Sequence, residues 1–222
     1  MTASFGKSIA RIWSADKKII LGTGFLATKN RVLTCFHLFD ANHIKNSEPV
    51  YVDFPLISTS HTPIAGKFFQ FHLDENTNQE LDLIGIDLPN KLPPEVEPSP
   101  ILYGDQIELF GHEFSTIGFP DETGKWLAGG EILGRLDDGL VQLHRTQHAK
   151  SFIQPGFSGA PVWDMKLNAI VGIVVAYRNE DDPHTAYMLP ISVVFKVWRE
   201  LINSSNVRIY FSNYDPIIFE YA

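Results

Sequence analysis

The stretch IQPGFSGAPVWD (residues 153–164) places a single serine, Ser158, among glycines and prolines before it continues into apolar residues. Gly156 and Gly159 permit backbone conformations with positive φ and let another part of the chain approach closely. The two prolines restrict the backbone on either side of the serine. Because Pro-Gly and Ser-Gly are also ordinary turn signals, the stretch taken alone leaves a simple surface turn open.

Composition limits the classes of protein that fit this chain. The 222 residues suffice for one large domain or two small ones, and 44% hydrophobic residues are typical of a globular protein. The net charge is −8, and lysine and arginine form no cluster along the sequence. Binding to nucleic acid or to an anionic membrane is therefore not expected.

Targeting signals and cysteines bear on the cellular compartment. The N-terminal segment lacks the apolar core of a signal peptide, and no run of residues approaches the length of a membrane span. The single cysteine, Cys35, excludes an intrachain disulfide. We therefore expect a cytoplasmic protein without a membrane anchor.

Short β-rich runs separated by turn signals dominate the first 190 residues and predict an all-β protein, a barrel or a sandwich. Residues 89–100 contain five prolines in twelve positions, which predicts a stiff connection between two halves. We expect a first β unit over residues 1–95, a second over 96–203 and a C-terminal extension over 204–222. Apolar residues at helical spacing between 194 and 202, with Ser192 as N-cap, predict a helix at the end of the second unit.

A nucleophilic serine needs a base within hydrogen-bonding distance and a third group that orients this base. His37 follows the β-rich run RVLTCF, and Asp82 precedes the apolar run LIGI. Seven other histidines show that a histidine alone means little in this chain. A metal site at His144 and His148 would need a helix, whereas LVQLH (residues 140–144) is typical of a strand, so no metal site is expected there.

The motifs VLTCFH, LDLIGI and PGFSGAPV resemble, in this order, the histidine, aspartate and serine motifs of trypsin-like (chymotrypsin-fold) serine peptidases. GTGFLAT, FSTIGFP and AYMLPIS are similar to strands of the bacterial, intracellular HtrA-type members, although no PDZ module follows. The resemblance covers about residues 15–200. It implies two packed antiparallel six-stranded β-barrels with a C-terminal α-helix, no cofactor, and a protein or peptide as substrate.

The resemblance also implies the roles of individual residues. Ser158 would attack the substrate carbonyl, His37 would act as the base, and Asp82 would orient His37. The backbone N–H groups of Gly156 and Ser158 would form the oxyanion hole. Four residues would line the substrate pocket, with uncharged substrate side chains preferred: Phe152, Val174, Val175 and Ala176. The acidic loop over residues 180–182 could reverse this preference if it folded back toward the pocket.

Three positions depart from the family pattern. Phe157 stands where secreted members carry an aspartate that pairs with a newly cleaved N-terminus, so we expect removal of residues 1–10 to leave activity unchanged. Control would then come from the segment after residue 206, from a regulatory partner or from an appended domain. Cys35 and Phe36 stand where small residues are usual, and a buried structural thiol is favoured over a redox-sensitive one.

Two other functions remain as alternatives. An α/β-hydrolase carries Gly-x-Ser-x-Gly with a helix after the serine and both partners downstream. Here position 160 is alanine, Pro161 and β-type residues follow the serine, and His184 is the only histidine downstream. A catalytically silent double barrel that serves as a binding or scaffolding module is the stronger alternative, since a fold never proves an activity.

Overall fold

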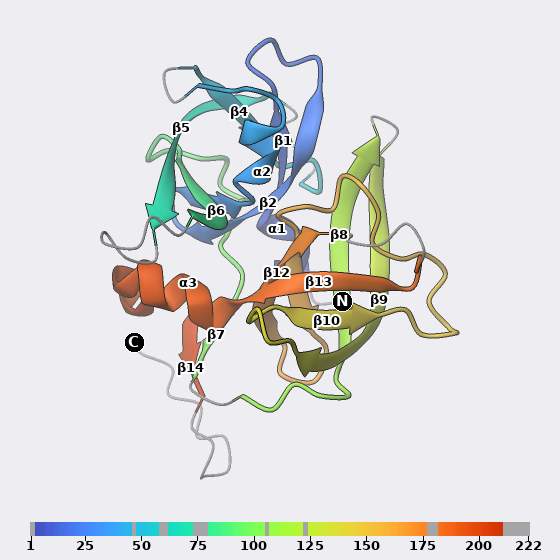
Figure 1. The fold of residues 1–222 in the computed structure, drawn as a ribbon. Coiled ribbons are helices and arrows are strands. Elements are labelled where there is room, and N and C mark those ends of the chain that lie inside the picture. Colours follow the sequence, from blue (N-terminus) through green and yellow to red (C-terminus); the bar gives the residue numbers. More distant parts are fainter. Residues whose placement is uncertain are drawn as a thin grey trace.

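The computed structural model describes residues 3–45, 48–57, 62–72, 80–104, 107–121, 124–176 and 182–210 (Figure 1). Six antiparallel strands of the first half close into a barrel in the order β1-β2-β3-β6-β5-β4. These strands are β1 (Ile9–Trp13), β2 (Ile20–Thr28), β3 (Arg31–Thr34), β4 (Val50–Asp53), β5 (Ile64–His72) and β6 (Glu80–Asp87).

Six strands of the second half form the second antiparallel barrel in the order β11-β8-β9-β10-β13-β12, closed by the pairing of β11 with β12. They are β8 (Glu113–Asp121), β9 (Gly124–Arg135), β10 (Val141–His144), β11 (Pro161–Asp164), β12 (Ala169–Ala176) and β13 (Thr185–Pro190). The predicted pair of six-stranded barrels is thereby confirmed.

Two short strands extend the second sheet beyond β12 with parallel pairing: β7 (Ile101–Tyr103) and β14 (Val207–Ile209). The beginning of the expected C-terminal extension is therefore part of the second sheet. The rest of this extension, residues 211–222, lies outside the described residues.

The C-terminal helix is present, but its predicted start is wrong. α3 (Ile191–Val197) begins directly after Pro190, which is the N-cap and makes no side-chain capping bond, so Ser192 lies inside the helix. The backbone leaves the helical region at Trp198 (φ −129°, ψ 76°), and the chain continues as the 3-10 helix η1 (Arg199–Asn203). None of the described helices is long and apolar enough to cross a membrane.

A continuous apolar core joins the two barrels. One cluster of buried residues fills the first barrel and reaches the second through Phe119, Trp163 and Val175, while another fills the second barrel. The N-terminal helix α1 (Ala3–Lys7) takes part, because the fully buried Phe5 packs against Trp163 with ring centroids 5.0 Å apart. The N-terminal segment is therefore part of the core, and removal of residues 1–10 cannot be the neutral change expected from the sequence.

The proline-rich segment, residues 89–100, contains no strand and connects β6 to β7. Near its end Ser99 is fully buried, and its hydroxyl lies 2.7 Å from the Ser8 hydroxyl, just before β1. The Asn206 side chain donates to the Ser99 carbonyl (2.8 Å) and to the Ala27 carbonyl of β2 (3.1 Å). The connection is thus fixed by hydrogen bonds to both ends of the chain.

Candidate active site

His37 is held at the point where the first barrel gives way to a short helix. β3 ends at Thr34, and α2 (His37–Asp40) begins three residues later. Leu38 and Phe39 are buried and anchor this helix in the core, whereas the His37 side chain is 41% exposed. The local sequence therefore fixes the backbone of His37 and leaves its ring accessible.

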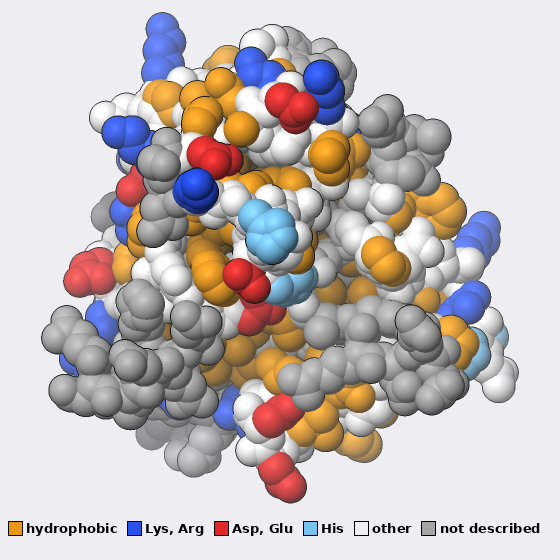
Figure 2. Space-filling model, turned by 45° about the horizontal axis from the view of Figure 1, so that its top comes forward, with side chains coloured by type: hydrophobic (Ala, Val, Ile, Leu, Met, Phe, Trp, Pro, Cys, Tyr) orange, Lys and Arg blue, Asp and Glu red, His pale blue; other side chains and the backbone are white. Residues whose placement is uncertain are grey.

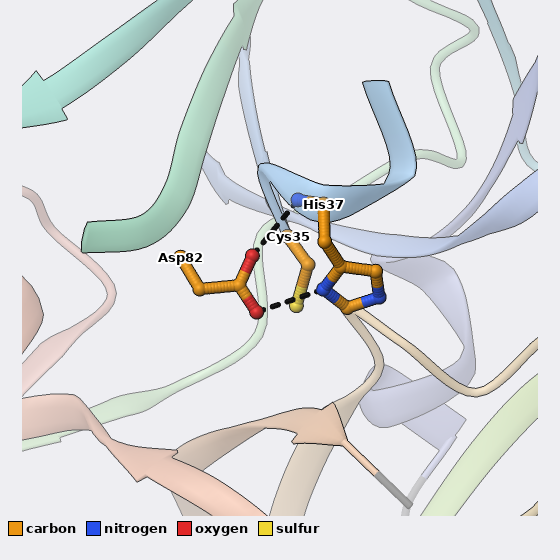
Figure 3. Close-up of side chains that lie close together, drawn as sticks. All are labelled: Cys35, His37 and Asp82. Carbon is orange, nitrogen blue, oxygen red and sulfur yellow. Dashed lines mark hydrogen bonds and ion pairs between the residues drawn. The ribbon is translucent and has the colours of Figure 1, made fainter. Parts of the chain in front are cut away.

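Asp82 contacts His37 at two points. β6 pairs with β3, which brings Asp82 beside the start of α2. The His37 backbone N–H donates to Asp82 Oδ1 (2.9 Å), and His37 Nδ1 lies 2.8 Å from Asp82 Oδ2 (Figure 3). A carboxylate at Nδ1 favours the tautomer with the proton on Nδ1, which leaves Nε2 free to accept a proton. The sequence prediction that these two residues act together agrees with this geometry.

Cys35 lies beside this pair on the buried side. Its side chain is fully buried, and its thiol donates to the Val174 carbonyl at 3.2 Å. Burial raises the pKa of the Cys35 thiol well above its ordinary value, and the nearby negative charge of Asp82 raises the pKa further. The sulfur, the His37 ring and the Asp82 carboxylate converge in Figure 3. Cys35 is therefore a neutral, buried thiol, as the sequence favoured.

The turn that carries Ser158 requires both of its glycines. Gly156 (φ +97°) and Gly159 (φ +84°) occupy the left-handed region. A Cβ on Gly156 would lie 2.4 Å from Pro120 Cα, and one on Gly159 would lie 2.0 Å from the Thr23 carbonyl oxygen. No side chain fits at either position, which answers why the stretch is rich in glycine.

The backbone N–H groups of the turn fall into two sets. The N–H groups of Phe157, Gly159 and Ala160 are bonded within the protein. Across the described residues, those of Gly156 and Ser158 donate to no protein group. Gly156 and Ser158 are also partly exposed. These are the two N–H groups that the sequence assigned to an oxyanion hole, and they are free to bind a ligand.

Thr23 of β2 ties this turn to the first barrel. Its N–H donates to the Ser158 carbonyl (3.0 Å), and its hydroxyl donates to the Gly156 carbonyl (2.8 Å). The Thr23 carbonyl accepts a bond of 2.6 Å from the hydroxyl of Thr34, which lies three residues before His37. The sequence pointed to GTGFLAT only as a similarity, and it contained no signal for these bonds.

The Ser158 turn and the start of α2 both pack against Gly22 of β2. A Cβ on Gly22 would lie 2.7 Å from Leu38, the residue after His37, and 3.1 Å from the Ser158 carbonyl oxygen. No hydrogen bond joins the Ser158 hydroxyl to His37 in the described part of the chain. Such bonds are often long without substrate and shorten when it binds. Histidine and acidic side chains gather near the middle of the face in Figure 2.

Phe157, which replaces the aspartate of secreted relatives, anchors the turn from below. It is fully buried in the second barrel, and its ring fills the space over Gly118, where a Cβ would lie 2.5 Å from the ring. An apolar contact therefore anchors the turn in the second barrel.

The residues predicted to line a substrate pocket lie in different places. Phe152 and Val174 are buried in the cluster inside the second barrel, whereas Val175 belongs to the cluster shared by both barrels. The Val174 N–H donates to the Ala160 carbonyl, and the Val174 carbonyl accepts from Gly159 and Cys35. The prediction that the Val174 backbone pairs with a substrate is therefore wrong, because its groups are already bonded.

The remaining pocket predictions are only partly covered by the described residues. Ala176 ends β12, and its side chain lies outside the described residues, as do Glu180 and Asp181. The exposed Asp182 accepts bonds from the His184 N–H (2.9 Å) and the Thr185 hydroxyl (2.6 Å), and these bonds lower its pKa. Asp182 thus stabilises its own loop, and the pocket as a whole stays a prediction.

Comparison with protein families gives a match to the trypsin-like peptidase domain over residues 22–173, a range that includes His37, Asp82 and Ser158. Comparison with curated protein sequences gives no significant match.

Solved structures similar to this chain include proteases. The inactive form of the Rv3671c protease of M. tuberculosis is 18% identical to this chain, with a TM-score of 0.63. The alignment covers 90% of this chain and 91% of that chain. The serine endoprotease of Yersinia pestis is also 18% identical, with a TM-score of 0.63 and coverage of 90% and 64%. Deg5 has 18% identity, a TM-score of 0.61 and coverage of 90% for both chains. At this identity the likeness concerns the fold.

Proposed function

Because the chain belongs to the trypsin-like peptidase family, we propose that it is a serine endopeptidase that uses Ser158, His37 and Asp82 as a catalytic triad. The observation that carries this proposal is the double contact of Asp82 with the backbone and the ring of His37. This contact would hold the base in one orientation, and the bonds of Thr23 tie the Ser158 turn to the first barrel.

The proposed reaction has two steps. Ser158 Oγ attacks the peptide carbonyl while His37 Nε2 takes the hydroxyl proton, and Asp82 stabilises the resulting imidazolium. The Gly156 and Ser158 N–H groups bind the developing oxyanion, each such donor contributing about 3 kcal/mol in comparable sites. His37 then gives its proton to the leaving amine, and water hydrolyses the acyl-enzyme through the same residues.

Covalent labelling with a fluorophosphonate tests the nucleophile. The wild-type chain should be labelled, and Ser158→Ala should not. Ser151→Ala is the matched control, because Ser151 precedes the same turn and its hydroxyl instead donates to the Leu127 carbonyl. Equal labelling of wild type and Ser158→Ala would contradict the assignment, and a folded wild type without any label would favour the silent binding module.

Turnover of a peptide substrate tests the triad as a unit. His37→Ala and Ser158→Ala should each lose activity by roughly 10⁴- to 10⁶-fold, because the members of a triad act together. Asp82→Asn should lose about 10⁴-fold, since it removes the acceptor that fixes the His37 tautomer. Near wild-type turnover in His37→Ala would show that another group is the base.

For the substrate we propose a protein or peptide cleaved after an uncharged side chain. At the predicted base of the pocket, Phe152 offers no carboxylate, and a lysine or arginine buried there would lose its hydration without a partner. Cleavage of a mixed peptide library should follow apolar residues. Dominant cleavage after arginine or lysine would contradict the proposed pocket.

A further inference from the structure

We propose that Cys35, His37 and Asp82 together bind a Zn²⁺ ion and that this ion turns the active site off. The binding site itself stands on the geometry of the three side chains. Its effect on catalysis rests on the proposed peptidase function.

The three side chains offer one donor atom each in a small volume. The Cys35 sulfur, a His37 ring nitrogen and an Asp82 carboxylate oxygen all lie within 4.8 Å of one another. Around a tetrahedral Zn²⁺ with bonds of about 2.0–2.3 Å, ligand atoms lie about 3.3–3.7 Å apart. To bind the ion, the three donor atoms would move closer together and the Cys35 thiol would give up its bond to the Val174 carbonyl.

The donor types suit Zn²⁺ better than the common hard cations. Thiolate and imidazole favour zinc and neighbouring transition metals, whereas Mg²⁺ and Ca²⁺ prefer a shell made of oxygen atoms. A thiolate and a carboxylate together balance the two positive charges of the ion. The three side chains leave a fourth position for water.

The cluster can be reached from solvent on one side only. The side chains of His37 and Asp82 are 41% and 36% exposed, whereas Cys35 is fully buried behind them. An ion therefore meets the imidazole and the carboxylate first and then the sulfur. Asp82 can offer Oδ2, the oxygen now at His37 Nδ1, to the ion while Oδ1 keeps the bond from the His37 backbone.

Metal binding would inactivate the base through a change of tautomer. His37 Nδ1 now contacts Asp82, and coordination at Nδ1 requires the ring proton to move to Nε2. A ring that carries its proton on Nε2 cannot accept the proton of Ser158. Cys35 releases its thiol proton to solvent, so each ion bound displaces one proton.

The chain contains a second histidine–aspartate pair, His112 and Asp164, which differs from the pair of His37 and Asp82 in its neighbours. His112 Nδ1 lies 2.8 Å from Asp164 Oδ2, but His112 Nε2 faces the Lys166 ammonium at 3.1 Å. The ammonium already supplies a positive charge at that pair. The single cysteine of the chain lies at the other pair. The thiol is what distinguishes the cluster at His37.

Direct titration of the full-length chain with zinc sulfate tests the site independently of activity. The wild type should bind one ion, and Cys35→Ala and Asp82→Asn should bind it about tenfold or more weakly. His148→Ala, which removes an exposed histidine outside the cluster, is the control and should bind as the wild type does. Thermal unfolding of each variant without metal verifies that it is folded. If Cys35→Ala does not fold, Asp82→Asn still tests the site.

Cobalt in place of zinc reports the sulfur ligand directly. The Co²⁺ complex of the wild type should show a thiolate-to-metal charge-transfer band that Cys35→Ala lacks. Wild-type affinity in Cys35→Ala, or a cobalt complex without this band, would overturn the site. If the site binds zinc as described but saturating zinc leaves peptide hydrolysis unchanged, the proposal that the ion inhibits the active site is wrong. A chain that binds zinc but never hydrolyses peptides refutes the peptidase function and leaves the metal site standing.

Discussion

Replacing Thr23 by valine should loosen the turn that carries Ser158, because the Thr23 hydroxyl is one of the groups that hold this turn to the first barrel. Thr23 is fully buried, and its hydroxyl donates to the Gly156 carbonyl (2.8 Å) and accepts from the Phe119 N–H (3.3 Å). Valine keeps the volume and removes both bonds. The backbone bond from the Thr23 N–H to the Ser158 carbonyl remains, so the chain should still fold.

The expected cost follows from the loss of these buried bonds. Removing one partner of a buried hydrogen bond lowers the free energy of unfolding by about 1–3 kcal/mol, because the other partner is left unsatisfied. For a chain of this size, that lowers the melting temperature by about 2–12 °C. Turnover should fall as well, because the Gly156 N–H belongs to the turn. Complete loss of an oxyanion-hole donor lowers kcat by about 10²–10³-fold. A Gly156 N–H that is only less well positioned should therefore lower kcat by up to about 10²-fold.

Thr116 provides the matched control for this substitution. It is also fully buried, but its hydroxyl has no hydrogen-bond partner among the described residues. Thr116→Val therefore removes an unsatisfied polar group and should leave the chain equally stable or about 1 kcal/mol more stable. Differential scanning calorimetry and peptide hydrolysis compare the two variants. Equal melting temperatures and equal turnover in both would refute the role given to Thr23.

Three further perturbations follow from the same contacts. Phe157→Ala should lower the free energy of unfolding, measured in urea, by about 3–5 kcal/mol, because a fully buried ring is lost beneath the Ser158 turn; a loss below about 1 kcal/mol would contradict this anchoring role. Removal of residues 1–10 should prevent stable folding, because it deletes the buried Phe5 and part of β1; a folded, active truncated chain, judged by circular dichroism, would contradict this. The pKa of the Cys35 thiol is raised in the folded state, so the unfolded chain loses this proton first. The stability of the fold should therefore decline as the pH rises above 9.0, the ordinary pKa of the thiol. Above pH 9, the free energy of unfolding of the wild type should fall relative to that of Cys35→Ala by up to about 1.4 kcal/mol per pH unit, and below pH 9 the difference between the two should not depend on pH. Unfolding free energies that change in parallel above pH 9 would contradict the raised pKa.

The sequence was most informative where side-chain chemistry and chain order coincide. His37, Asp82 and Ser158 were proposed from residue types beside β-rich runs and from the resemblance of their motifs, and the structure brings His37 and Asp82 into contact. The conformations of Gly156 and Gly159 were also predicted, since a glycine that must adopt positive φ has no common substitute. These signals are local, and a sequence contains them directly.

The features that could not be predicted depend on contacts between distant residues. The sequence signal for β9 is weak because its first half alternates poorly, with exposed Trp126 and Leu127 beside each other and glycines after them. Gly130 is required there because a Cβ would lie 2.1 Å from the carbonyl oxygen of His144 in β10, a contact that only tertiary pairing creates. Likewise, Val174 looks like any strand residue until its carbonyl is seen to accept from Gly159 and Cys35.

The distribution of these contacts implies that the candidate site forms only when the two barrels dock. The first barrel supplies His37, Asp82 and Thr23, and the second supplies the Ser158 turn. Gly159 packs so closely on the first barrel that a Cβ would lie 2.2 Å from the Thr34 hydroxyl, and its N–H is bonded to Val174 within the second barrel. The turn thus has one conformation that satisfies both sides at once. Because the continuous core drives the docking, the backbone around Ser158 is set by the burial of apolar residues far from it, such as Phe5 against Trp163.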